Sequence, residues 1–166
     1  MTPGKPLGRH LALNNSDMAR LQWALTCRDV SIDGATNNIT YRDAIEQLRV
    51  REFPADIPPF ILVAVLWRRE DIDTPESLEY RITLEDYEGN RSGYTEPQEV
   101  DLESFERVRA SLPNPPMEIE EPGTIWFVIE KNENGGWEEA SRLPVEIKST
   151  EESEVEISAE EAVAED

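Results

Sequence analysis

Residues 78–87 of the chain read LEYRITLEDY and alternate between apolar and polar side chains. One face collects the apolar residues Leu78, Tyr80, Ile82 and Leu84. This period of two is typical of a β-strand that buries one face and exposes the other. The Glu88-Gly89-Asn90 sequence that follows predicts a turn, after which 91–100 returns as a weaker edge strand that Pro97 interrupts.

Two glycine-containing turns predict further hairpins on either side of this strand. Asp33-Gly34 is a strong hairpin signal, because a type I′ turn requires positive φ at both central positions. Asn134-Gly135-Gly136 marks a second hairpin, and Pro144 indicates an edge position in its returning strand. Together these signals predict strands at about 21–30, 38–45, 60–67, 78–87, 91–100, 117–121, 124–131 and 137–147.

The middle of the chain contains a proline-rich crossing and a wholly apolar strand. Residues 53–59 read FPADIPP, and their three prolines exclude a regular helix and favour a crossing between two sheets or between two ends of one. Residues 60–67, FILVAVLW, are apolar on both alternating sets, which predicts a central strand covered on both faces. Residues 102–112 fit either a short helix or, from Phe105, a strand that ends before Pro113.

Seven or eight short strands separated by turns predict an all-β protein with at most one short helix. We expect an antiparallel two-sheet sandwich of the Ig-like or C2-like kind, with a barrel as the alternative. The predicted organisation is a flexible leader at 1–19, the sandwich at 20–149 and an acidic, disordered tail at 150–166. A chain of 166 residues fits a single domain.

The charge of the chain limits the partners that it can bind. The formal net charge is −20, and residues 1–150 alone hold 28 acids against 16 bases. Such a surface repels phosphate backbones and anionic lipid headgroups, so we expect neither direct nucleic-acid nor membrane binding. The longest apolar run, at 60–67, is too short to span a bilayer, and no signal peptide is recognisable. Cys27 is the only cysteine, which excludes an intramolecular disulfide and suits a cytoplasmic protein.

Several stretches resemble a family of uncharacterised bacterial and phage β-sandwich proteins, a domain of unknown function. The resemblance rests on WALTCRDV at 23–30, the Asp-Gly turn, FPADIPPFILVAVLW at 53–67, DYEGN at 86–90 and PGTIWFVIEKNENGGW at 122–137. It covers about three quarters of the chain. Because each stretch is a turn, a crossing or a core strand, the resemblance implies a fold and no activity.

Residue types that carry catalysis are scarce in this sequence. The single histidine, His10, falls in the predicted leader, and Cys27 lies on the apolar side of a strand, where a thiol packs as a small hydrophobe. The sequence contains neither of the glycine-rich phosphate-binding motifs. We therefore expect no enzyme activity and no cofactor, with a two-carboxylate hydrolase as an alternative.

Calcium binding is a further alternative, because loops at one end of C2-like sandwiches gather carboxylates around the ion. The candidate ligands are the loop acids Asp71, Asp73, Asp86 and Glu88.

The leading hypothesis is a non-catalytic binding or accessory module that contacts another protein. Trp67, Trp126 and Trp137 fall near strand ends and are the candidates for a partner surface. A third hypothesis is an acidic inhibitor that mimics DNA, in which the net charge of −20 would bind the basic groove of a nucleic-acid enzyme.

Overall fold

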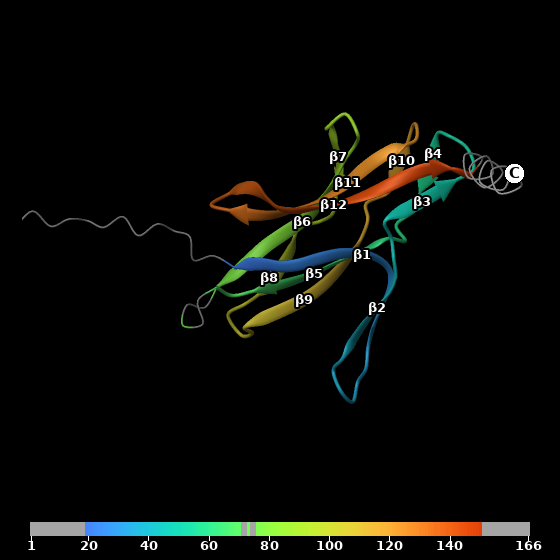
Figure 1. The fold of residues 1–166 in the computed structure, drawn as a ribbon. Coiled ribbons are helices and arrows are strands. Elements are labelled where there is room, and N and C mark those ends of the chain that lie inside the picture. The colour runs from blue at the N-terminus through green and yellow to red at the C-terminus, as the bar shows by residue number, and fades with distance from the viewer. Residues whose placement is uncertain (1–18, 71–72, 74–75, 151–166) are drawn as a thin grey trace, which may run out of the picture.

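The computed structural model describes residues 19–70, 73 and 76–150, and every regular element in these ranges is a β-strand (Figure 1). The strands are β1 (Arg20–Ile32), β2 (Ile39–Ala44), β3 (Gln47–Val50), β4 (Ala55–Ile57), β5 (Leu62–Arg68), β6 (Ser77–Glu85), β7 (Arg91–Tyr94), β8 (Gln98–Asp101), β9 (Arg107–Pro113), β10 (Met117–Ile119), β11 (Gly123–Glu133) and β12 (Gly136–Ser149). The leader and tail predicted at the two ends fall outside the described residues, apart from the buried Ala19 and the exposed Thr150. None of the described residues belongs to a helix that is long and apolar enough to span a membrane.

The strands form three sheets. One sheet has four strands in the order β2-β1-β5-β9, and a second has six, in which β3-β12-β11-β6-β7 are neighbours and β8 also pairs with β6. The third consists of β10 and β4 alone. All pairs are antiparallel except β12 with β3, which is parallel. Both large sheets end in edge strands, so the barrel alternative is excluded and the fold is an open, mixed all-β arrangement.

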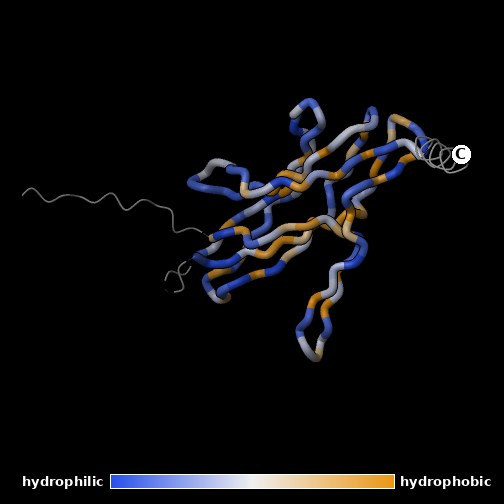
Figure 2. Tube along the Cα trace, viewed as in Figure 1, coloured by the Kyte–Doolittle hydropathy of each residue, from blue (hydrophilic) through white to orange (hydrophobic). Residues whose placement is uncertain are grey.

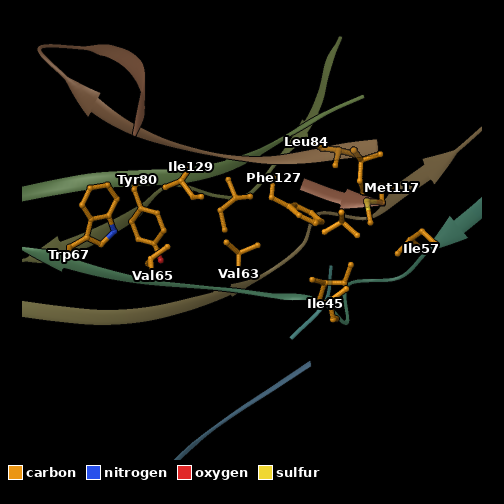
Figure 3. Close-up of a cluster of buried hydrophobic side chains, with 14 of the residues drawn as sticks. Ile45, Ile57, Val63, Val65, Trp67, Tyr80, Leu84, Met117, Phe127 and Ile129 are labelled. Carbon is orange, nitrogen blue, oxygen red and sulfur yellow. The ribbon is translucent and has the colours of Figure 1, made fainter. Parts of the chain in front are cut away.

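The hydrophobic core lies between the four-stranded and six-stranded sheets (Figure 3). Val63, Val65 and Trp67 of β5 face Tyr80 of β6 and Phe127 of β11, all of them fully buried. Hydrophobic colour recurs at intervals along the tube in Figure 2, as expected when each strand buries one face. The alternation that the sequence predicted is therefore what builds the core.

The described residues form twelve strands, which corrects the predicted seven or eight. Five of the twelve have only three or four residues: β3, β4, β7, β8 and β10. The prediction missed β3 and β4 and treated β7 and β8 as one strand at 91–100, whereas β10 lies within the strand expected at 117–121. Residues 107–113 form a strand, which confirms the strand alternative for this stretch over the helix. At Pro144, β12 pairs with β11 on one side and with no strand on the other, because β3 pairs with β12 only from Glu146. The edge position predicted for Pro144 is therefore confirmed.

The two predicted hairpin turns differ in their geometry. Asn134 and Gly135 both have positive φ, of 54° and 85°, which confirms the tight turn between β11 and β12. The turn at Asp33-Gly34 is instead a six-residue loop between Ile32 and Ile39, in which Asn37 takes the left-handed conformation. The Asp33 carboxylate accepts the backbone N–H groups of Ala35 and Thr36, at 2.8 and 2.9 Å, and closes this loop without a type I′ turn.

Candidate functional site: the outer face of the six-stranded sheet

The three tryptophans predicted for a partner surface separate into two environments. Trp67 is 0% exposed and packs in the core with its ring centroid 5.7 Å from that of Tyr80 (Figure 3). Its assignment to a partner surface was wrong, because position 67 has the inward parity of Val63 and Val65 on β5. Trp126 and Trp137 are half-buried on β11 and β12.

Strand alternation places the two remaining tryptophans on the sheet face that points away from the core. Ile125, Phe127 and Ile129 of β11 point inward, so Trp126 and Glu130 point outward. A register shift between Ile129 and Glu130 then re-aligns β12, so that Glu139 pairs with Glu130 and Trp137 with Asn132. We call this outer surface the arginine–aromatic face; it comprises Arg81, Thr83, Glu85, Arg91, Tyr94, Trp126, Glu130, Trp137, Glu139 and Arg142.

The most buried charge on this face is the carboxylate of Glu130, whose side chain is 4% exposed. Its Oε2 accepts hydrogen bonds from Arg81 Nε at 2.8 Å and from the Thr83 hydroxyl at 2.7 Å. Its Oε1 accepts a third, from Arg91 Nη1 at 2.6 Å. Burial raises the pKa of Glu130, but these hydrogen bonds and the charges of the two arginines outweigh it and hold the pKa below its ordinary value. Glu130 is therefore ionised at neutral pH.

A second group of ion pairs joins the same face to β7 and β12. Arg91 Nε donates to Glu85 at 3.0 Å, and Arg142 Nη1 donates to the other oxygen of Glu85 at 2.8 Å. Arg142 also makes a two-pronged contact with Glu139, with both distances 2.7 Å, and Arg91 Nη2 reaches the same carboxylate at 3.1 Å. The hydrogen bonds from Arg142 are the main reason that the pKa of Glu139 is lowered.

The aromatic rings of this face are stacked on its arginines. The Arg81 guanidinium carbon lies 4.3 Å from the Trp137 ring centroid and 5.0 Å from that of Tyr94. Arg142 covers the ring of Trp126 at 5.6 Å. Each arginine is held by a carboxylate as well, so the rings and the guanidinium groups fix one another in place.

This arrangement has the chemistry of a contact surface. Each of the three carboxylates is bound to at least two arginines, and the pKa values of Glu130 and Glu139 are lowered, so neither of these two suits the role of a general acid at neutral pH. Three arginines balance three glutamates, which leaves this face near neutral on a chain of net charge −20. Arg81, Thr83 and Glu85 were predicted only as a solvent face. Their cross-strand partners depend on the pairing of β6, β7, β11 and β12, which the sequence did not reveal.

Of the calcium candidates, the structure brings together only Asp86 and Glu88, whose carboxylates both accept hydrogen bonds from the Asn90 side chain. Asp71 lies outside the described residues, while Asp73 precedes β6 and Asp86 follows it, so a strand of nine residues, about 27 Å long, separates the two in the chain. The Asp86 carboxylate is occupied by the N–H groups of Glu88 and Asn90, at 2.9 and 2.8 Å, and these contacts help to lower its pKa, the largest effect being the bond from the Asn90 side chain. Among the described residues, no three His, Cys, Asp or Glu side chains are grouped so that they could hold a metal ion.

A small hollow next to this turn does gather acids. It measures about 200 Å³, has an apolar floor that includes Leu84 and Ile125, and is rimmed by Tyr87 and five acids: Asp86, Glu88, Glu118, Glu120 and Glu121. A hydrogen bond between the Tyr87 phenol and Glu121 is the main cause that raises the pKa of Tyr87 to about 12. The acids surround the hollow without forming a metal-binding group.

Comparison with known proteins adds no family to this geometry: no protein-family model matches the chain, and no curated protein does so either. The fold and the site define an all-β protein with a rigid, aromatic and arginine-rich sheet face. Its function is argued from that face.

Proposed function

We propose that this protein is a non-catalytic binding module, a sandwich of the Ig-like or C2-like kind, which contacts a partner protein through its arginine–aromatic face. The resemblance to bacterial and phage β-sandwich proteins agrees with this proposal and stays a prediction.

One observation supports the proposal above the others: Trp137, Tyr94 and Trp126 are presented on one face of a sheet and held by ion-paired arginines. Tryptophan, tyrosine and arginine are the residues that most often dominate the energy of protein interfaces. Tyr94 is 66% exposed, the largest exposure among the large hydrophobic side chains of the described residues. Because the rings are already held by Arg81 and Arg142, little conformational entropy remains to be lost when a partner binds.

The charge balance of the face also favours a protein partner. The chain as a whole has a net charge of −20, whereas each carboxylate of this face is neutralised by arginine. A near-neutral aromatic surface surrounded by negative charge fits a partner with an apolar centre and a basic rim.

A matched pair of tyrosine substitutions tests the proposal. Tyr94→Ser removes the exposed ring of the face, and Tyr87→Ser removes a ring that is 52% exposed outside it. Each variant and the wild-type protein would serve as bait in an extract of the native host, and the captured protein would be purified and its affinity measured. We expect Tyr94→Ser to weaken binding about tenfold and Tyr87→Ser to leave it unchanged. Equal affinity of both variants would contradict the assignment.

A further inference from the structure

The outer face of the four-stranded sheet carries a second surface, which the proposed function does not use. Two fully buried residues, Cys27 of β1 and Ala64 of β5, do not belong to the core cluster between the sheets. They have the outward parity of their strands, since Val63, Val65 and Trp67 point to the core. Something other than the core therefore covers them.

The cover is a layer of half-buried apolar side chains on the same face. Trp23 and Leu66 are cross-strand partners in β1 and β5, and Leu25 and Leu62 are the partners of the two buried residues. No other sheet of the described chain packs on this layer, because the core cluster occupies the opposite face. Apart from Tyr41 of β2, whose ring centroid lies 5.2 Å from that of Trp23, the layer has no packing partner among the described residues.

Arginines border this layer along the edge strand β9. Arg109 pairs with Leu66 and Arg107 with Arg68, so both have the outward parity, whereas Val108, Ala110 and Leu112 pack against the core. Within the described ranges neither Arg107 nor Arg109 forms a salt bridge, although acids outnumber bases more than twofold in the whole chain. These two arginines differ in this respect from those of the arginine–aromatic face, each of which has a carboxylate partner.

A groove opens at one end of the same surface. It has a volume of about 470 Å³ and is lined by Leu66, the 59%-exposed Phe105, Gln22, Arg107, and Arg68 with its ion-pair partner Glu106 at 3.0 Å. The groove thus combines an apolar wall with guanidinium groups. We call this groove, the apolar layer and the two unpaired arginines the β9 face.

We propose that the β9 face binds an acidic, extended protein segment whose apolar side chains enter the groove beside Phe105 and whose carboxylates pair with Arg107 and Arg109. β9 is the last strand of its sheet, so its outer edge can hydrogen-bond an added strand. A strand paired there places alternate side chains on the β9 face, next to the arginines. A long nucleic acid is disfavoured, because its many phosphates would meet the net charge of −20, whereas a short segment brings few charges and apolar groups.

Selection from a displayed library of random twelve-residue peptides tests this proposal with the full chain as the target. We expect the enriched peptides to carry both Asp or Glu and large apolar residues at every second position, because only alternate side chains of an added strand face the arginines and the groove. The best peptide should bind at least tenfold more weakly to the Arg107→Ser/Arg109→Ser variant and about fivefold more weakly to Phe105→Ser. The control is Arg49→Ser/Arg51→Ser, which removes the same charge from exposed positions in and after β3 and should leave the affinity unchanged.

Several results would overturn the proposal. These are no enrichment, enrichment without acidic residues, or equal weakening by the Arg49/Arg51 control.

Two further measurements distinguish other occupants. Binding of a single-stranded oligonucleotide that is lost in the Arg107/Arg109 variant would assign the face to nucleic acid. Sedimentation that shows a wild-type dimer and a monomeric Arg107/Arg109 variant would assign it to a second copy of the chain. The far-ultraviolet circular dichroism of each variant should match that of the wild type, since the substituted side chains are exposed.

Discussion

The guanidinium carbon of Arg81 lies 4.3 Å above the ring of Trp137, while its Nε donates to the buried carboxylate of Glu130. The same arginine thus links a buried charge on β11 to a half-buried ring on β12. Removing any one of the three should loosen the other two, because ion pairs and stacked rings that share a member are not independent.

Replacement of Glu130 is expected to destabilise the fold more than that of any exposed acid. Glu130→Gln keeps the size of the side chain but removes the charge that Arg81 and Arg91 neutralise, and breaking a buried ion pair costs on the order of 3 kcal/mol. Urea denaturation monitored by circular dichroism measures this loss. Glu99→Gln, at an exposed position of β8, serves as the control and should change the free energy of unfolding by less than about 0.5 kcal/mol.

The free energy of unfolding should decrease in acid, because the pKa values of Glu130 and Glu139 are lower in the folded protein than in the unfolded chain. In the unfolded chain both carboxyls have a pKa of about 4.3. Their contribution to the stability is therefore complete above that pH and is lost as the pH falls through their lower pKa values in the folded protein. The urea midpoint should therefore be nearly constant from about pH 7 to 5 and then decrease. The decrease should be smaller in Glu130→Gln, and an identical pH profile for the two proteins would disprove this origin.

Cys27 should be unreactive in the folded protein. It is 0% exposed under the apolar layer of the β9 face, and burial is the main cause that raises the pKa of its thiol. A disulfide reagent at pH 8 should label it slowly in buffer and within seconds in concentrated urea. Rapid labelling of the native protein would mean that the layer formed by Trp23, Leu25 and Leu62 is open.

Two tryptophan substitutions should separate the core from the surface. Trp67→Ala removes a fully buried ring and should cost about 3–5 kcal/mol, which lowers the melting temperature by tens of degrees or prevents folding. Trp126→Ala removes a half-buried ring from the arginine–aromatic face and should cost far less. Thermal unfolding compares the two, and similar losses would contradict the different environments described for them.

Local patterns predicted most of the long strands. The alternation at 78–87 gave β6 and its inward face, and the Asn134-Gly135 turn gave the β11–β12 hairpin, because period-two burial and positive φ are properties of neighbouring residues. The short β4 was missed, since it lies among prolines and its only strand partner is the distant β10.

The candidate site was predicted in part. The sequence identified Trp126 and Trp137 and treated Trp67 alike, because a run that is apolar on both faces does not reveal which parity meets the core. The ion pairs of Glu130 join residues as far as 49 positions apart, and which charges meet depends on strand order and on the register shift after Ile129. These are properties of the assembled sheet, which a local pattern does not encode.

Site-specific photo-cross-linking tests the central claim most directly. A photoreactive amino acid would replace either Tyr94 on the arginine–aromatic face or the 61%-exposed Ile32 at the end of β1, where the β1–β2 hairpin leaves the body of the molecule (Figure 1). Irradiation in the native host should give a discrete adduct with another protein from position 94 and none from position 32. The same adduct from position 32, or no adduct from position 94, would contradict the claim that this face binds a partner.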